Sequence, residues 1–364
     1  MAGVIVVIFH PEPRPGAGPL ERWVGEQRRA LAERHATGFV AAGAATDDVR
    51  IVAGTPDDTP FGARLRAFVA AERPAGLVVL GSGSVPLATA ADLRAFLAAA
   101  SGSGPEVLTN SRFSADIVAV ARPDVLLGLP DHLSDNGLPR WLAEAGGCAV
   151  TERRSARLSV DIDGPLDLLL AGGRGAVGRP LPPPGIDLAA ALAALAGVRS
   201  VAADPRAELV VAGRTSASTL AWLERNAAAR VRAFVEERGL RAATSPRDPG
   251  AAVPPNRRPP RSLLGTLLER DGAAALGGLL AGLGDGAVVD SRVLMAHRLG
   301  ADDGGWPAPE DRYASDLLLP DRVADPWLRE LTHSAATAAI PIVLGGHTLV
   351  GPGLRFALRG GWGR

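Results

Sequence analysis

Short apolar runs alternate with longer amphipathic segments along the first half of the chain. The runs are too short for membrane spans and read as strands buried on both faces, while the amphipathic segments carry apolar residues at helical spacing. Thr89, with an aspartate in the turn that follows, predicts a helix start. The expected strands span 4–9, 76–80, 116–120 and 158–162, and the expected helices span 20–35, 61–71, 89–100 and 138–145. This alternation indicates an α/β fold with a mainly parallel sheet covered on both faces.

A Gly- and Pro-rich stretch at 172–185, GGRGAVGRPLPPPG, interrupts the pattern and is typical of a linker. A second α/β rhythm follows it, together with a long Pro-rich loop at 244–261. Its expected strands span 209–212, 231–235, 287–295 and 340–344, and its expected helices span 187–196, 216–223, 263–283 and 326–338. We therefore expect a first α/β domain at 1–171, a linker with a short helix at 172–197, and a second α/β domain at 198–364.

Composition narrows the classes of function. The 39 basic residues balance 39 acidic ones, so no net field favours nucleic acid or an anionic membrane as partner. Every basic residue is Arg, which excludes Schiff-base and Walker-A lysine chemistry and is typical of a GC-rich bacterial genome. The single cysteine, Cys148, excludes an intrachain disulfide and a cysteine zinc site. With no signal peptide or membrane-spanning run, we expect a cytoplasmic protein.

Two segments carry a resemblance to a known family. Residues 160–168 read VDIDGPLDL, and residues 77–97 read LVVLGSGSVPLATAADLRAFL. Over roughly residues 1–170 the chain resembles the nucleotidyltransferase-like GT-A domain of molybdenum-cofactor nucleotidyltransferases and phospholactate guanylyltransferases. The resemblance implies a GT-A-like (Rossmann-like) fold and transfer of a nucleotidyl group from a nucleoside triphosphate. The implied acceptor is a small phosphorylated molecule or cofactor precursor, and the implied cofactor is Mg²⁺ or Mn²⁺.

The resemblance also implies a set of site residues. Asp161 and Asp163 would be the catalytic metal ligands, because two carboxylates two residues apart on a strand share one face. The alternative is that Asp163 caps the next helix and Asp161 is solvated or paired with an Arg. Arg14, Gly16 and the turn Gly81-Ser82-Gly83-Ser84 are placed to contact the nucleotide. Independently of the resemblance, the polar segment at 110–116 either sets Asn110 and Asp116 beside the same ligand or forms a turn before a strand.

The sequence departs from the family pattern in its first loop and at its metal site. The first strand is followed by HPEPRPGAG at 10–18, whose prolines lack the backbone donors that a phosphate needs, and the family's lysine is missing. The turn Gly81-Ser-Gly-Ser84 stands where the family has a metal-binding aspartate. These departures favour a second hypothesis, a catalytically degenerate protein that binds a nucleotide or cofactor, or serves as a scaffold.

The second half offers a third hypothesis, an enzyme site of its own. Asp290 and His297 flank an expected strand, and His347 follows a Gly-Gly turn after the last strand. With Arg214 after another strand, such residues would meet at the carboxyl edge of a sheet, where α/β proteins bind ligands. A histidine among aspartates suits acid–base chemistry or a metal site. Structural ion pairs are the alternative interpretation of the same residues.

Overall fold

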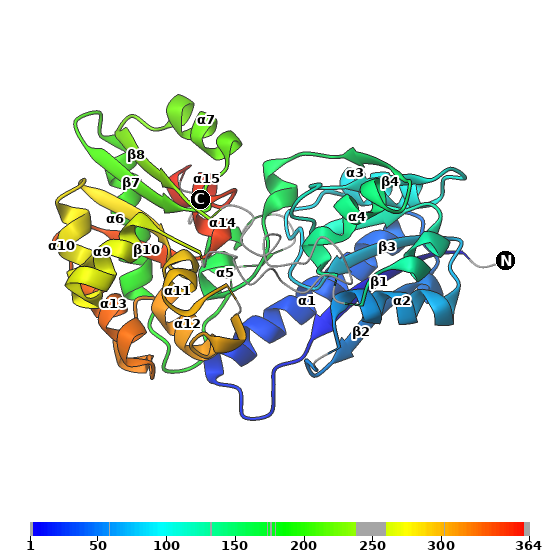
Figure 1. Ribbon diagram of the computed structural model, residues 1–364, viewed down its shortest axis with the longest axis horizontal. Helices are drawn as coiled ribbons and strands as arrows, with labels where there is room; N and C mark the ends of the chain where they lie inside the picture. The colour runs from blue at the N-terminus through cyan, green and yellow to red at the C-terminus, as the bar shows by residue number, and fades with distance from the viewer. Residues whose placement is uncertain are drawn as a thin grey trace.

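Two β-sheets form the centres of the two halves in this computed structural model (Figure 1). The structure describes residues 3–57, 59–131, 133–172, 174, 177–178, 180–237, 260–301 and 303–359. Most of the Pro-rich loop expected at 244–261 therefore lies outside the described residues. In the described part of the chain, no helix combines the length and apolar character that crossing a membrane requires.

The first sheet has six strands in the order β2-β1-β3-β5-β4-β6. The strands β1, β2 and β3 are parallel to one another, as are β4 and β6, whereas β5 runs antiparallel to both of its neighbours. The strands are β1 (Val4–Pro11), β2 (Val49–Gly54), β3 (Gly76–Gly81), β4 (Glu106–Thr109), β5 (Ile117–Val120) and β6 (Ala149–Glu152). The expectation of a mainly parallel sheet is confirmed, with one reversed strand.

Helices cover both faces of this sheet. Alternate residues of β1 enter two separate cores, Ile5 and Val7 on one face and Val6 and Ile8 on the other. The helices of this part are α1 (Pro19–Ala41), α2 (Phe61–Glu72), α3 (Ala90–Ala100), α4 (Leu138–Glu144) and α5 (Pro165–Ala171). The predicted start of α3 is confirmed, because the Thr89 side chain and the Asp92 carboxylate form a reciprocal capping box.

The second sheet has four parallel strands in the order β10-β9-β7-β8. Its strands are β7 (Glu208–Gly213), β8 (Arg230–Val235), β9 (Gly286–Asp290) and β10 (Ile342–Gly345). Its helices are α6 (Ala189–Ala203), α7 (Ala217–Asn226), α9 (Leu263–Asp271), α10 (Leu276–Ala281), α11 (Ser291–Leu299), α12 (Pro309–Asp316), α13 (Pro326–Ala336), α14 (His347–Val350) and α15 (Leu354–Arg359). The fold class, α/β with mostly parallel sheets, is as the sequence predicts.

Short 3-10 turns complete the described structure. They are η1 (Thr46–Asp48), η2 (Pro123–Gly128), η3 (Asp135–Gly137), η4 (Ala156–Ser159), η5 (Ala273–Ala275), η6 (Asp303–Gly305) and η7 (Pro320–Arg322).

Two predicted strands are wrong. Residues 158–162 were expected to extend but lie in and after η4, where the Ser159 hydroxyl donates to the Ser155 carbonyl. The strand expected at 287–295 ends at Asp290, and α11 begins at Ser291. There the Ser291 hydroxyl donates to the carbonyl at the end of the neighbouring strand β10, and the chain turns away from the sheet.

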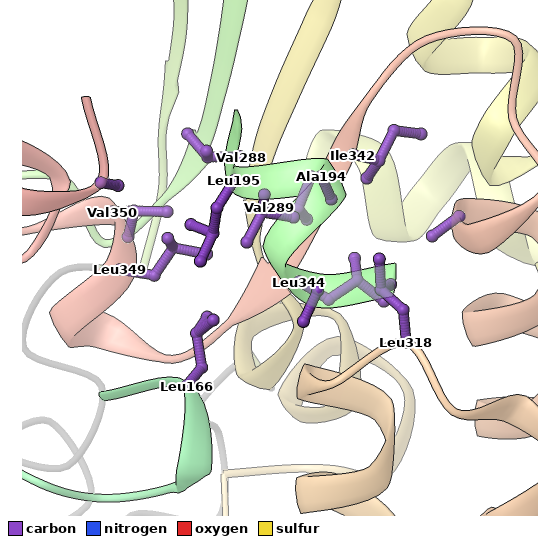
Figure 2. Packing of buried hydrophobic residues seen from close by; sticks show 14 of the residues in the cluster. Leu166, Ala194, Leu195, Val288, Val289, Leu318, Ile342, Leu344, Leu349 and Val350 are labelled. Carbon is purple, nitrogen blue, oxygen red and sulfur yellow. The ribbon is translucent and has the colours of Figure 1, made fainter. Parts of the chain in front are cut away.

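The hydrophobic core of the second half extends into the first. Leu20, Trp23, Val24 and Leu31 of α1 belong to the same buried cluster as the strands β7, β9 and β10. Figure 2 shows Leu166 of α5 beside this cluster, among side chains of β9, β10 and α14. The boundary expected after residue 171 stays a prediction, since buried packing continues across it.

Candidate functional site

A cavity of about 240 Å³ opens at the carboxyl ends of β1 and β3 in the first half. This edge of a parallel sheet is where α/β proteins commonly bind ligands. The described lining residues are Phe9, Pro11, Arg28, Phe61, Val79, Leu80, Gly81, Ser82, Gly83, Ser84, Ala115, Asp116, Val118, Asp135, Leu138 and Asp161. The lining thus combines apolar side chains with a Gly-Ser turn, three carboxylates and one arginine.

The Gly81–Ser84 turn is held firmly by its surroundings. The Ser82 amide donates to the Phe9 carbonyl at 2.9 Å, and the Ser82 hydroxyl shares a 3.0 Å hydrogen bond with His10 Nδ1. Gly83 passes so close to the chain around Asp161 that a Cβ there would lie 2.7 Å from a backbone oxygen. The turn therefore accommodates a close approach that only glycine permits.

Strain and a buried histidine mark the end of this turn. Val85 is buried and adopts a φ of 45°, a left-handed conformation that a β-branched residue rarely takes. His35 of α1 donates from Nε2 to the Ser84 carbonyl at 2.9 Å. Burial lowers the pKa of His35 to about 4, so the ring is neutral at physiological pH.

Asp116 and Asp161 face the same cavity from different segments. The Asn110 side chain positions Asp116, with its Nδ2 donating to the Asp116 carboxylate at 2.6 Å and its Oδ1 accepting from the Asp116 amide. Burial and the charge of Asp161 raise the pKa of Asp116 well above its usual range. Burial and the charge of Asp163 raise the pKa of Asp161 to about 7. Two buried carboxylates with raised pKa values are stabilised when one of them is protonated or when a cation binds beside them.

Arg28 of α1 is the only basic residue in the described lining. Its Nε donates to the Ile162 carbonyl at 2.6 Å, and its Nη2 lies 3.4 Å from the Asp163 carboxylate. Burial lowers the pKa of the Arg28 guanidinium, but the nearby acidic groups, Asp163 and Asp161 among them, outweigh this effect and the pKa is raised. This arginine was not among the residues singled out from the sequence, because it lies in a helix whose other arginines are solvated.

Asp161 and Asp163 do not share the face of a strand, contrary to expectation. Asp161 forms an isolated antiparallel bridge with Ser84, and the exposed side chain of Asp163 pairs with Arg28. Their different settings follow from η4, which replaces the expected strand and leaves no pleat to align them. The helix α5 that follows is capped by Asp167, whose carboxylate accepts from the amides of Asp163 and Gly164.

The structure brings some of the expected nucleotide contacts together and leaves others apart. Gly81, Ser82, Gly83, Ser84 and Asp116 line the cavity, and Asn110 lies directly behind Asp116.

Arg14 and Gly16 lie in the exposed loop between β1 and α1, and neither belongs to the described cavity lining. Asp135 does line it, and it comes from the polar segment after Pro130, a loop whose composition alone gave no role.

The candidate residues of the second half separate into two places. Arg214 follows β7, Asp290 is the last residue of β9, and His347 comes two residues after β10, so all three lie at the carboxyl edge of the parallel sheet, as expected. Arg214 binds Asp290 with two hydrogen bonds of 2.6 and 3.0 Å, and the charges of Arg214 and His347 lower the pKa of Asp290 despite its burial. The arrangement is a buried ion pair.

His297 lies elsewhere, in the last turn of α11 rather than beside a strand. Its Nδ1 accepts from the Ser262 amide at 3.0 Å, and its Nε2 lies 3.1 Å from the Glu269 carboxylate. The expected grouping of His297 with Asp290 and His347 is therefore wrong, because the helix carries it seven residues beyond the strand end.

The side chains that commonly bind metal ions do not form a complete metal site in the described part of the chain. Over the described residues, no group of three or more His, Cys, Asp or Glu side chains is arranged to hold a metal ion. A cation at Asp116 and Asp161 would need further ligands from a bound molecule.

Comparisons with known proteins give distant likenesses. No family model and no curated protein matches the chain. Among solved structures, a nucleotidyl transferase from Methanothermobacter thermautotroptrophicus is 19% identical over 46% of this chain and 94% of its own, with a TM-score of 0.33. The protein Rv0371c from Mycobacterium tuberculosis H37Rv is 19% identical over 46% of this chain and 95% of its own, with a TM-score of 0.30. Likenesses this distant carry no argument about chemistry, which has to come from the residues of the cavity.

Proposed function

We propose that the cavity binds a nucleoside triphosphate with a divalent cation, and that the chain transfers the nucleotidyl group to a small acceptor. The observation that carries this proposal is the placement of Asp116 and Asp161 in the lining of one cavity, beside the Gly81–Ser84 turn at the carboxyl edge of β1 and β3. Crowded carboxylates with raised pKa values mark a place where positive charge stabilises the protein.

The donor set fits Mg²⁺ or Mn²⁺ when a nucleotide is present. Carboxylate and hydroxyl oxygens are the ligands these ions prefer, and Mg²⁺ is commonly held by one or two carboxylates together with substrate phosphates. Asp116 and Asp161 would be those carboxylates, and Asp135 faces the same cavity. When bound, the ion would neutralise phosphate charge. This assignment replaces Asp163 by Asp116 as the second carboxylate.

Arg28 would take the place of the lysine that this chain lacks. Its planar guanidinium is fixed by the Ile162 carbonyl and Asp163, and it borders the cavity from α1. A preformed guanidinium binds phosphate oxygens with two donors in a fixed geometry. The resulting interaction orients the triphosphate relative to the two carboxylates.

The remaining lining suits the rest of a nucleotide. The Gly81–Ser84 turn brings backbone groups and serine side chains, which can donate to or accept from a ligand, to the cavity lining. Phe9 and Phe61, whose rings meet edge to face at 6.2 Å, give the cavity an apolar wall for a base.

A nucleotide-binding protein without turnover is the second candidate, and two observations favour it. Of residues 10–18, where the resemblance predicts a triphosphate-binding loop, Pro11 alone belongs to the described lining of the cavity. Ser84 supplies no charge in the turn where the resemblance predicts a metal-binding aspartate. Both candidates share the binding site and differ only in whether a product forms.

Thermal unfolding with ATP, GTP, CTP and UTP, each with and without Mg²⁺ or Mn²⁺, tests binding. A nucleotide at a hundred times its Kd adds about 2.7 kcal/mol to the free energy of unfolding. We expect a metal-dependent rise in Tm with one nucleotide, lost in Asp161→Asn and Asp116→Asn. Asp124→Asn, at an exposed carboxylate outside the described lining, is the matched control.

Two further readouts complete the test. The Asp163→Asn variant distinguishes the ligand pair implied by the resemblance, Asp161 with Asp163, from the proposed pair, Asp161 with Asp116. If Asp163→Asn loses the metal dependence and Asp116→Asn keeps it, the pair implied by the resemblance is favoured. Pyrophosphate release with phosphorylated small-molecule acceptors distinguishes transfer from binding. No Tm rise with any nucleotide and metal would overturn the proposal.

A further inference from the structure

Arginines gather around Trp222 in the second half of the molecule, where α7 and α15 pack together (Figure 1). The guanidinium carbons of Arg355 and Arg359 lie 5.8 and 5.1 Å from the centre of the Trp222 ring. Arg225 follows on α7 and is exposed. We call Arg225, Arg355 and Arg359 the arginine cluster.

The hydrogen-bond partners of the arginine cluster are neutral. Arg355 Nη2 donates to the Ser218 carbonyl at 3.3 Å, and Arg359 Nη2 donates to Asn226 Oδ1 at 2.6 Å. Arg355 Nε is buried and makes no hydrogen bond with the described residues. Among those residues, no carboxylate pairs with any of the three guanidinium groups within 4.0 Å.

The helices around the cluster add positive charge rather than cancel it. The helices α6, α7 and α15 together carry four arginines, the fourth being Arg199, and one acidic residue, Glu224. Glu224 is two residues from Trp222, which places it about 200° away around α7. Since the whole chain is balanced at 39 charges of each sign, this concentration is a local excess.

Like charges raise the free energy of the cluster. Burial and the charges of Arg359 and Arg225 lower the pKa of Arg355. Elsewhere in the same half, the half-buried Arg214 binds the carboxylate of the buried Asp290 with two hydrogen bonds. The cluster therefore differs from the structural ion pairs of this half, in which each guanidinium has its own counter-charge.

We propose that Arg225, Arg355 and Arg359 form a binding site for a phosphate or diphosphate group, with Trp222 as its floor. Guanidinium groups match the geometry of phosphate oxygens, and an anion bound there would relieve the repulsion between them. The ligand class is a small phosphorylated molecule or free diphosphate. The site is separate from the carboxylate-lined cavity and needs no divalent cation.

Calorimetric titration of the full-length protein with inorganic pyrophosphate tests this site. The buffer contains EDTA, and NaCl keeps the ionic strength fixed, so the proposed metal-dependent cavity does not contribute. We expect saturable binding to one site, about tenfold weaker in Arg359→Gln and in Arg225→Gln. Arg94→Gln, which removes an exposed arginine from α3, should bind as the unmodified protein does.

Each outcome decides for or against the site. Because Arg225 is exposed, Arg225→Gln keeps the test valid if substitution at Arg359 disturbs folding. Titration with ADP distinguishes the two sources, since tighter binding of ADP indicates an esterified diphosphate and tighter binding of pyrophosphate a free one. Absence of binding, or equal affinity in all variants, would overturn the proposal.

Discussion

Replacing Asp161 by Asn is expected to stabilise the protein in EDTA at pH 8. Burial and the charge of Asp163 raise the pKa of Asp161 from 3.8 to about 7. A carboxyl group whose pKa rises on folding stabilises the fold below its unfolded pKa, and this contribution is lost as the pH rises through the folded pKa. The difference between 3.8 and about 7 corresponds to about 4 kcal/mol.

The expected gain is smaller than that limit. Asp161 keeps partial contact with water, and its carboxylate accepts a 2.9 Å hydrogen bond from the Ile162 amide. An asparagine oxygen can accept the same bond, so the variant loses the repulsion and keeps the contact. We therefore expect Asp161→Asn to raise the free energy of unfolding by about 2 kcal/mol at pH 8 and by much less at pH 4.

Urea unfolding at intervals from pH 4 to pH 8 in EDTA measures this difference. The unmodified protein should lose stability across that range more steeply than Asp161→Asn, and Asp124→Asn should follow the unmodified protein. Addition of Mg²⁺ with the bound nucleotide should stabilise the unmodified protein and leave the variant unchanged. An Asp161→Asn protein no more stable than the unmodified one at pH 8 would refute the reasoning about crowded carboxylates.

Three further predictions concern the supports of the site. Folding lowers the pKa of His35 from 6.5 to about 4, so the free energy of unfolding should fall by about 3 kcal/mol as the pH drops from 6.5 to below 4. His35→Gln should remove this step from acid unfolding curves. The Glu310 carboxylate accepts hydrogen bonds from two amides at the start of α1, so Glu310→Ala should lower the free energy of unfolding by about 1 kcal/mol. As a control, Glu330→Ala, at an exposed position of α13, should change it little. The fully buried Asp92 carboxylate binds two arginines, so Asp92→Asn should cost about 3 kcal/mol in urea unfolding, and a loss below 1 kcal/mol would contradict the ion pairing.

The sequence predicts the elements whose pattern is strong. The apolar run of β3 and the cap at Thr89 specify a buried strand and a helix start by local chemistry alone. The antiparallel direction of β5 could not be predicted from the sequence, because an apolar strand that is buried on both faces has the same composition whether it runs parallel or antiparallel to its neighbours. The short edge strands β2 and β6 are half exposed and were not predicted.

The sequence identified part of the cavity lining, namely the Gly81–Ser84 turn, Asp116 and Asp161. Gly81–Ser84 follows β3 directly, so the sequence identifies it as cavity lining. Arg28 is one of several arginines in α1, and only the packing of that helix against the chain around Ile162 distinguishes it. The strand expected to carry Asp163 is absent, because an alternating pattern predicts a strand whereas strand pairing depends on a partner that the pattern does not reveal.

The helix α1 contributes to the cores of both halves, and this affects the synthesis of the chain as well as its stability. Its first turns pack in the core of the second half, and its last turns, with Ala32 and Phe39, pack against the first sheet. During synthesis, the side chains of Leu20, Trp23 and Val24 cannot be buried until strands more than 180 residues further along the chain have been made. The emerging first half therefore presents an apolar helix face to its surroundings, and cleavage within residues 172–185 before assembly would leave that face permanently uncovered.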